Sequence, residues 1–318
     1  MSTDIDVNKA SNNTNNTGRY DIENDERLYF LQESYVRQTN AYARMSDDKL
    51  EAVLQSLRAI AGDDSLIELA LEWKDKIFAP RGIFDDIESH GFVIPCRAPL
   101  MPVVVLFSGV DALRRFYAER DIPESMLIDI LYDTSRNMDE AFAKNGNYNI
   151  ESGLIGWQTR HYTGRLFQLG RLQYEAMLIK RDNRLLQKGD YVINTHIPSG
   201  GKLPHEEVRD SYRRAAAFFA RLMPDIPFKG FVCESWMLSP QLREMLDERS
   251  NLVRFQSDYE LYGTEEDESF YSYVFIKKPG DLRALQEDTA LRRAIKARLL
   301  AGGKIMSGRG FFPLDKAL

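Results

Sequence analysis

The front half of the chain carries the spacing of apolar residues that is typical of amphipathic helices. Between residues 27 and 45 large apolar side chains recur every three or four positions, with polar residues between them. A second stripe covers 47–61, preceded by Ser46 as a candidate N-cap and followed by Gly62 as a stop. Similar patterns predict helices at 64–78, at 110–120 and, with Pro123 in the first turn, up to Lys144.

Two segments of this half are less regular. The stretch at 91–107, GFVIPCRAPLMPVVVLF, is rich in β-branched residues and proline, and its periodicity does not separate a buried strand from a helix. The run NGNYN at 145–149 is the most turn-like part of the middle chain. Because single domains usually stop growing near about 250 residues, we place a domain boundary there. The predicted units are a disordered tail at 1–18, a helical domain at 19–150 and a second domain at 151–318.

The back half changes to the alternation expected of strands. Residues 165–180 have strand preference, and their apolar side chains at every second position from Leu172 share one face. A charged turn at 181–190 leads to a return strand at 191–198, and the glycine-bearing loop at 199–204 leads to a helix that ends near Met223.

The remaining chain continues the alternation and completes an order β-β-α-β-α-β-β. We expect strands at 231–236, 251–262 and 271–278, a short helix at 240–248, a last helix at 281–300 and a glycine-rich tail. The second and third of these strands are expected to form a hairpin. The fold class predicted is therefore α+β, with a helical N-terminal domain followed by a mixed β-sheet flanked by helices.

Composition excludes several classes of function. Asp and Glu total 48 against 42 Lys and Arg, which gives a net charge of −6 and no basic field for nucleic acid or an anionic membrane. No apolar run reaches the roughly 18 residues of a membrane span, and the N-terminus lacks the apolar region of a signal peptide. Cys96 and Cys233 form no metal or disulfide motif, so we expect a cytoplasmic protein without a metal.

Three separated motifs carry a resemblance. They are LGRLQYE at 169–175, THIPSGGKL at 195–203 and FVCESWMLSPQL at 231–242. In this order, they resemble the core of the GNAT N-acyltransferases over roughly 165–280. The whole chain is similar to bacterial proteins that join a helical N-acyltransferase N-terminal domain to a GNAT-like C-terminal domain. The resemblance implies acetyl-coenzyme A or another acyl-coenzyme A as co-substrate.

The resemblance also implies where coenzyme A binds. GNAT proteins hold it where two central strands splay apart, with its pyrophosphate on the loop before the central helix. Backbone N–H groups and glycines suit a phosphate at such a place. The familiar Q/R-x-x-G-x-G/A pattern is not reproduced, so a connection that merely needs glycine is the alternative. The expected cofactor-binding residues are Ile197, Ser199, Gly200, Gly201 and Lys202.

An amine acceptor is mostly protonated at neutral pH, so its attack on a thioester needs a base. His196, at the end of a predicted strand, is one candidate, since an imidazole titrates near ~6.5. Glu175 on the preceding strand and Glu234 on the next are the others. The structural alternatives are a buried, hydrogen-bonded His196 and an ion pair of Glu175 with Arg171 or Arg165.

The sequence also suggests or argues against catalytic roles for other side chains of this region. Ser235 or Tyr259 is a candidate to protonate the leaving thiolate, and either is also an ordinary hydrogen-bonding residue. We expect Cys233 to be a small hydrophobe and not a nucleophile. The acidic run TEEDES at 264–269 either attracts a cationic amine or is a solvated hairpin tip. Trp157 is expected to pack in the core.

The sequence thus predicts an N-acyltransferase that transfers an acyl group from acyl-coenzyme A to a small-molecule or peptide amine. The mechanism expected is direct attack in a ternary complex, with His196 or Glu175 removing the proton. The alternative is a GNAT-like module that binds acyl-coenzyme A, or mediates an interaction, without turnover. A third hypothesis keeps the fold and assigns an unrelated ligand.

Overall fold

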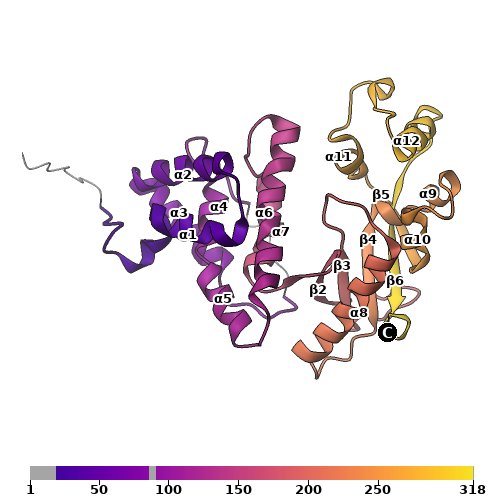
Figure 1. The fold of residues 1–318 in the computed structure, drawn as a ribbon, viewed down its shortest axis with the longest axis horizontal. Helices are drawn as coiled ribbons and strands as arrows, with labels where there is room; N and C mark the ends of the chain where they lie inside the picture. Colours follow the sequence, from indigo (N-terminus) through magenta and orange to yellow (C-terminus); the bar gives the residue numbers. More distant parts are fainter. Residues whose placement is uncertain (1–18, 86–90, 318) are drawn as a thin grey trace, which may run out of the picture.

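The computed structural model describes residues 19–85 and 91–317, so the predicted tail at 1–18 lies outside the described residues. Helices make up the N-terminal part, and a six-stranded mixed sheet with flanking helices makes up the C-terminal part (Figure 1). The α+β class predicted from the sequence is confirmed. The domain boundary at residue 150 falls in the turn between the long helix α6 and helix α7, and it stays a prediction.

Most of the predicted N-terminal helices are present, with two differences. The helix expected at 27–45 is broken at Gln32, whose backbone is extended. The ambiguous stretch ends in helix α4, whose seven residues are all buried. A helix surrounded by others is apolar on every side, which explains why its sequence showed no period. The helices are η1 (Glu26–Leu31), α1 (Glu33–Ala43), α2 (Asp47–Ala61), α3 (Asp64–Ile77), α4 (Met101–Phe107), α5 (Val110–Ala118) and α6 (Glu124–Asn145).

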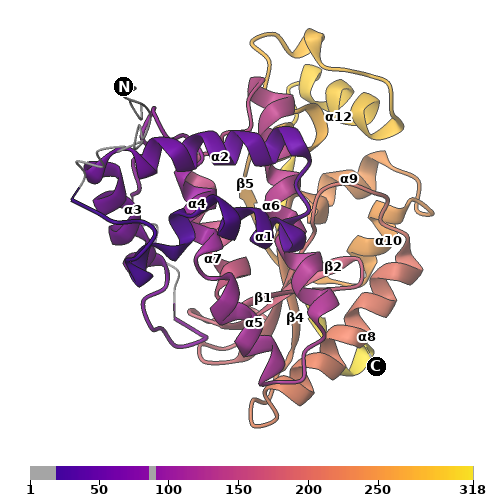
Figure 2. The same cartoon turned by 60° about the vertical axis from the view of Figure 1, so that its left-hand side comes forward.

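Helix α7 (Ser152–Tyr162) has no counterpart among the predicted elements. It follows α6 after a short turn in which Gly146 adopts a left-handed conformation, φ +72°. Figures 1 and 2 show α6 and α7 between the other N-terminal helices and the sheet. Helices α6 and α7 would therefore form the N-terminal wall of any site at this side of the sheet.

The sheet has the order β1-β2-β3-β4-β6-β5. Its only parallel neighbours in the described chain are β3 and β4, and the other pairs are antiparallel. The strands are β1 (Leu166–Leu169), β2 (Leu172–Leu178), β3 (Tyr191–His196), β4 (Gly230–Ser235), β5 (Glu260–Glu266) and β6 (Met306–Pro313). The strand predicted at 165–180 is divided into β1 and β2 by a turn at Gly170, and the return strand predicted at 191–198 is confirmed as β3.

The centre of the sheet opens. Strands β3 and β4 pair only at Ile193 with Phe231 and at Asn194 with Val232, so their C-terminal ends diverge. Helix α8 (His205–Leu222), confirmed where the sequence predicted it, covers one face through Tyr212, whose ring contacts Phe231. The opposite face is left for the N-terminal helices and the connection between β2 and β3.

Two predicted strands near the C-terminus are wrong. Residues 251–262 begin as helix α10 (Asn251–Ser257), capped by the Ser250 side chain, and only then enter β5. Residues 271–278 overlap helix α11 (Phe270–Phe275), so they form no hairpin with β5. The partner of β5 is β6, which comes from the predicted glycine-rich tail. A Cβ at Gly308 would lie 2.3 Å from the Leu238 carbonyl oxygen, so close backbone approach requires this glycine.

Residues 267–305, called the inserted segment below, lie between β5 and β6. The predicted helix at 281–300 is shorter than expected, and its first residues are irregular. Apolar residues of the segment, among them Phe270 and Ile295, form a small cluster with Trp236 and Leu242, apart from the main core. Figure 1 shows α11 across a gap from α6. The elements here are η2 (Trp236–Leu238), α9 (Pro240–Met245), η3 (Leu282–Ala284), α12 (Ala290–Leu300) and η4 (Leu314–Lys316).

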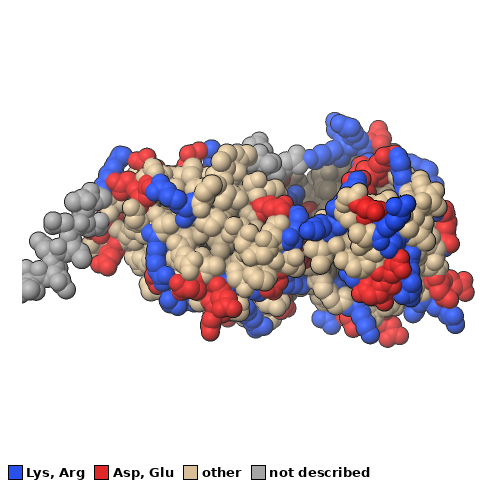
Figure 3. Space-filling view, turned by 90° about the horizontal axis from the view of Figure 1, so that it is seen from above, with Lys and Arg blue, Asp and Glu red and all other residues tan. Residues whose placement is uncertain are grey.

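Charged side chains of both signs are interspersed over the face drawn in Figure 3. None of the helices within 19–85 and 91–317 combines the length and the apolar character that crossing a bilayer requires.

Candidate active site

A cavity of about 930 Å³ lies where β3 and β4 diverge. Thr195 and Cys233 line it from strand positions that face α8, whereas His196 and Glu234 line it from the opposite face of the sheet. The space therefore borders both faces of the sheet at the two strand ends, and it is called the passage below.

The walls of the cavity come from three parts of the chain. Asp133 on α6 and Trp157 on α7 form the N-terminal side, Ser235 lies at the end of β4, and Tyr273 projects from the inserted segment. Side chains far apart in the sequence thus meet at the end of β3.

His196 is held by a carboxylate on the neighbouring strand. Its Nε2 lies 2.9 Å from Glu175 Oε1, and the Asn194 amide donates to the same oxygen at 3.1 Å. Asn194 Nδ2 is also 3.1 Å from His196 Nε2. An N–H donor on Nε2 satisfies the carboxylate, so the neutral imidazole carries its basic lone pair on Nδ1. The arrangement is that of an oriented general base.

Glu175 is ionised in this environment. Burial is the largest influence and raises the pKa of this carboxyl, but the hydrogen bond and charge of His196 together with the charge of Arg160 outweigh it, and the pKa is about 2. The Arg160 Nε–Glu175 Oε2 distance is 3.1 Å. The predicted ion pair of Glu175 with Arg171 or Arg165 is wrong, because the cationic partner of Glu175 is Arg160 of α7. His196 and Glu175, predicted as competing bases, are in contact.

Trp157 covers the imidazole of His196. The two rings meet edge to face with centroids 4.7 Å apart, and the Trp157 ring also contacts His161 at 5.3 Å. Trp157 lines the cavity, whereas the sequence indicated a core residue. An indole at this place keeps bulk water from one side of the His196–Glu175 pair.

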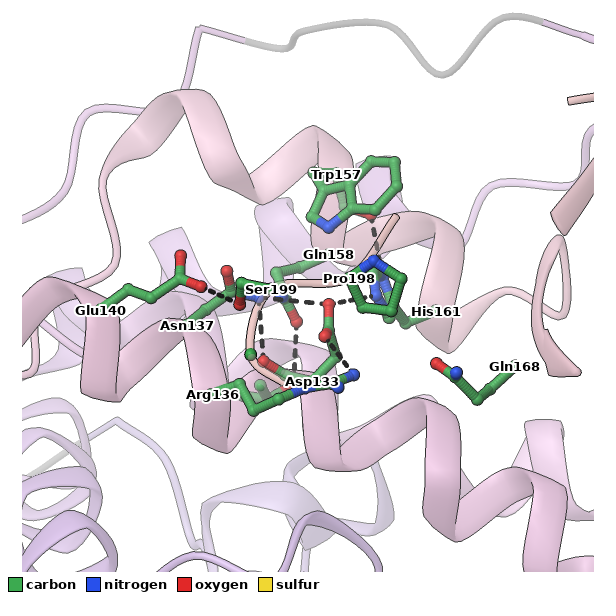
Figure 4. Close-up of polar contacts among 12 residues, drawn as sticks. Asp133, Arg136, Asn137, Glu140, Trp157, Gln158, His161, Gln168, Pro198 and Ser199 are labelled. Carbon is green, nitrogen blue, oxygen red and sulfur yellow. Dashed lines mark hydrogen bonds and ion pairs between the residues drawn. The ribbon is translucent and has the colours of Figure 1, made fainter. Parts of the chain in front are cut away.

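A second buried pair fixes α7 on α6. His161 Nε2 lies 2.8 Å from Asp133 Oδ2, and Arg136 lies 2.6 Å from the other oxygen of the same carboxylate (Figure 4). Burial raises the pKa of Asp133, but the contacts with His161 and Arg136 outweigh it and leave the pKa at about 2. His161 Nδ1 is 3.1 Å from the Trp157 carbonyl oxygen. The pair therefore sets the position of the helix that carries Trp157.

The other candidate groups have different environments. Glu234 forms an ion pair with Arg309 at 2.9 Å, and burial together with a hydrogen bond to Glu265 raises its pKa. Cys233 is fully buried, and burial raises the pKa of its thiol to about 12. Ser235 Oγ accepts a hydrogen bond from the Met237 N–H at 3.1 Å and lines the cavity.

Tyr259 lies near Thr195 and Cys233 but is not among the residues that line the cavity. Its hydroxyl accepts a hydrogen bond from the Tyr212 hydroxyl at 2.9 Å, and both side chains are buried under α8. The structure therefore brings Ser235, and not the Tyr259 ring, to the wall of the cavity.

The acidic run at 264–269 is largely paired. Glu265, Glu266 and Glu268 form ion pairs with basic side chains. Asp267 is different, since it lines the cavity and accepts hydrogen bonds from the hydroxyls of Ser269 and Ser307. Burial raises the Asp267 pKa, but these hydrogen bonds outweigh it and lower the pKa below the ordinary value. An ionised carboxylate therefore faces the cavity.

The loop between β3 and α8 lines the cavity from Ile197 to Gly201. Gly200 and Gly201 both have left-handed backbones, with φ +80° and +74°, which other residues rarely adopt. The Ser199 hydroxyl donates to Glu140 of α6, which ties the loop to the N-terminal helices (Figure 4). The fifth predicted residue, Lys202, is exposed and follows directly.

Comparison with known families decides what this arrangement is. Residues 166–312 match the GNAT-like C-terminal domain, and residues 35–164 match the N-acyltransferase N-terminal domain. The chain belongs to the GNAT-like N-acyltransferases. The passage between β3 and β4 is thus the splay that the resemblance implied, and the motifs at 169–175, 195–203 and 231–242 all border it.

Solved structures of acyltransferases share the fold of this GNAT-like protein. One, in complex with decanoyl-coenzyme A, has a TM-score of 0.77 and 26% sequence identity over 87% of each chain. Another, in complex with coenzyme A and 10C-teicoplanin, has a TM-score of 0.76 and 26% identity, covering 88% of this chain and 87% of its own. A mutant acyltransferase in complex with octanoyl-coenzyme A has a TM-score of 0.75 at 25% identity and 88% coverage of both chains. Among curated proteins, none matches the chain significantly. The protein is an acyltransferase.

Sequence reasoning missed three residues of the acyltransferase site. Asn194 had a usable signal, because it lies two positions before His196 and so shares its face of the strand. Trp157 and Arg160 had none, because the helix that carries them was not predicted and its buried face includes polar residues such as Gln158 and His161.

Proposed function

We propose that this enzyme transfers an acyl group from acyl-coenzyme A to the nitrogen of an amine by direct attack within a ternary complex. The observation that carries the proposal is the contact of His196 with the ionised Glu175 at the mouth of the splay. Direct attack needs a base beside the amine and a second approach for the thioester. The cavity, which reaches both faces of the sheet, supplies both.

His196 would take the proton. With Nε2 committed to Glu175, its Nδ1 accepts a proton from the attacking amine, directly or through one water molecule. The carboxylate then stabilises the imidazolium that forms. Arg160 and Asn194 also bind Glu175, and its pKa of about 2 makes it a weak base, so the carboxylate orients the imidazole and is not itself the base.

The thiolate of coenzyme A leaves on the other side of the reacting carbon. Ser235 at the end of β4 is the donor we assign to it. Its oxygen already accepts from Met237, which leaves its own O–H free to donate. Cys233 beside it is buried with a raised pKa, so an acyl-enzyme intermediate is not part of the proposal.

Coenzyme A would lie along the loop before α8, with its pyrophosphate on the N–H groups of Ser199, Gly200, Gly201 and Lys202 and its pantetheine arm passing Ile197. The two left-handed glycines support this, because they let the backbone approach a phosphate closely. Neighbouring solved structures contain octanoyl- and decanoyl-coenzyme A. Apolar side chains in the cavity wall support an acyl chain of similar length here, among them Leu154, Trp157, Val274 and Leu291.

The acceptor would enter from the face that carries His196. Asp267, across the cavity on the inserted segment, would attract the ammonium form of the amine before it is deprotonated. One solved neighbour contains teicoplanin together with decanoyl-coenzyme A. We therefore propose an acceptor of that bulk, bound between α6 and the inserted segment.

Release of coenzyme A thiol, followed with acetyl-, octanoyl- and decanoyl-coenzyme A against a panel of amines, tests the proposal. Mass spectrometry of the products shows whether the new bond is an amide. Direct attack predicts intersecting double-reciprocal plots when both substrates are varied, together with an unmodified enzyme mass. Parallel plots with an acylated enzyme would overturn the direct mechanism, and thiol release that no amine stimulates would overturn the transfer itself.

A further inference from the structure

Arg171 binds the backbone of the loop that precedes α8. It comes from the turn between β1 and β2, and its guanidinium donates to three loop carbonyl oxygens. Nε lies 2.8 Å from the Lys202 oxygen, Nη1 3.2 Å from that of Pro198, and Nη2 3.1 Å from that of Gly200. One side chain therefore orients three peptide groups of the loop.

Each peptide group whose carbonyl binds Arg171 also has an N–H donor, which points away from that carbonyl. A trans peptide directs its C=O and its N–H in opposite directions, so the three carbonyls fix the N–H groups of Ser199, Gly201 and Leu203. Within residues 19–85 and 91–317 none of these three donates to a protein acceptor. Unpaired backbone N–H groups in the turn around Gly200 and Gly201 are donors available to an anion.

The charge of Arg171 is balanced only in part, by the Glu207 carboxylate, with which it forms no direct ion pair. Its partners are neutral carbonyls, and it forms no ion pair with a carboxylate in the described part of the chain. Burial is the largest influence on its guanidinium and lowers the pKa, and the nearby positive charge of Arg136 acts in the same direction. Two glycines make the loop flexible when nothing holds it. The guanidinium thus contributes both a fixed loop shape and a positive charge near it.

We infer that Arg171 is a positioning residue that holds the loop before α8 in the conformation that binds the pyrophosphate of acyl-coenzyme A. It acts from outside the loop, in a chain whose loop lacks the usual Q/R-x-x-G-x-G/A pattern. The inference rests on the assignment of this loop to coenzyme A under the proposed function. The residue acts through the loop backbone and does not contact the reacting atoms.

The test compares acyl donors with and without the pyrophosphate-linked nucleotide. Octanoyl-coenzyme A contains the pyrophosphate and the 3′-phosphoadenosine, whereas octanoyl-pantetheine lacks both and offers the same thioester. In Arg171→Met we expect KM for octanoyl-coenzyme A to rise about tenfold or more, with kcat changed less than about twofold. KM for octanoyl-pantetheine should stay as in the wild type. Arg171→Lys keeps the charge but not the forked set of donors. Its KM for octanoyl-coenzyme A should therefore lie between those of the wild type and Arg171→Met.

A matched control is available in Arg165. It is also a partly buried arginine that donates to backbone carbonyls, those of Gly82 and Asp85, on the N-terminal side of the sheet. Arg165→Met removes a comparable set of contacts without touching the loop. We expect it to leave the ratio of the two KM values unchanged. Thermal unfolding of all variants shows whether each is folded.

Calorimetric titration with desulfo-coenzyme A gives a readout without turnover. A Kd raised about tenfold in Arg171→Met supports the inference even if no amine tested is acylated, which would be a failure of the proposed function alone. An unchanged Kd, or an equal loss with octanoyl-coenzyme A and octanoyl-pantetheine, would overturn the role of Arg171. The same holds if Arg165→Met shifts the two KM values by the same ratio as Arg171→Met.

Discussion

The indole of Trp157 and the imidazole of His196 meet edge to face, with centroids 4.7 Å apart and planes at 67°. The first ring belongs to α7 and the second to the end of β3, so the contact joins the N-terminal helices to the sheet at the cavity. Arg160, one turn further along α7, makes the second connection through Glu175. The N-terminal part therefore supplies part of the cavity wall.

Replacement of His196 tests the base. In His196→Gln we expect kcat to fall by about 10²–10⁴, the usual contribution of a positioned base, while the Kd of desulfo-coenzyme A stays unchanged. Steady-state kinetics and calorimetry measure the two quantities. Glu234→Gln is the control, because Glu234 was the other candidate on a neighbouring strand. A comparable loss in that variant, or an active His196→Gln enzyme, would contradict the assignment.

Glu175 links stability to pH. The folded-state pKa is about 2 and the ordinary value is 4.5. Because the folded value is the lower one, ionised Glu175 stabilises the fold above pH 4.5, and this contribution, on the order of 3 kcal/mol, is lost as pH falls toward 2. We expect the melting temperature of Glu175→Gln to be lower than that of the wild type at pH 7, and this gap in melting temperature to narrow by pH 3. Glu266→Gln, which removes an exposed ion pair, should show a small gap throughout.

The two cysteines should react differently with alkylating reagents. Cys96 is exposed, whereas Cys233 is buried and has a pKa raised to about 12 by burial. We expect iodoacetamide at pH 8 to modify Cys96 alone in the native protein, as peptide mass spectrometry would show. Cys233→Ala should retain activity within a few-fold. An acyl adduct on Cys233 in the presence of acyl-coenzyme A would refute this expectation.

Asp267 should determine affinity for the amine. We expect Asp267→Asn to raise KM for a cationic acceptor by about three- to tenfold and to leave KM for acyl-coenzyme A unchanged, because one negative charge leaves the cavity wall. The difference should shrink with added salt. Glu268→Gln, one residue away and paired with Lys278, is the control. Equal effects of the two substitutions would assign the change to overall charge and not to the cavity.

The sequence predicted those parts of the fold that depend on local pattern. The antiparallel pair β2–β3 and helices α2, α3, α6 and α8 have clear periods and short connections. The pairing of β5 with β6 depends on a contact across residues 267–305, which no local pattern reports. Without that contact, aromatic residues at 271–278 look like a strand, although they pack as a helix in a separate small core.

The site was predicted as a set of candidates, and their relationship came from the structure. His196 and Glu175 were identified separately because each lies on a strand near the expected splay. Their contact depends on the register that places Glu175 opposite Asn194, and this register is set by the geometry of the turn at 179–190. The placement of the Trp157 ring against His196 depends on α7, whose apolar residues show no clear helical periodicity.

The inserted segment begins and ends on two adjacent strands, β5 and β6, and it buries its apolar side chains largely in a small cluster shared with Trp236 and Leu242. Exchange for the corresponding segment of a related enzyme would have to preserve these contacts but would leave β3 and His196 unchanged. Because Val274 and Leu291 reach the cavity from the inserted segment together with Asp267, we expect such chimaeras to change both the amines accepted and the preferred acyl chain. Under the proposed function, the choice of both substrates would follow a segment that lies outside the sheet.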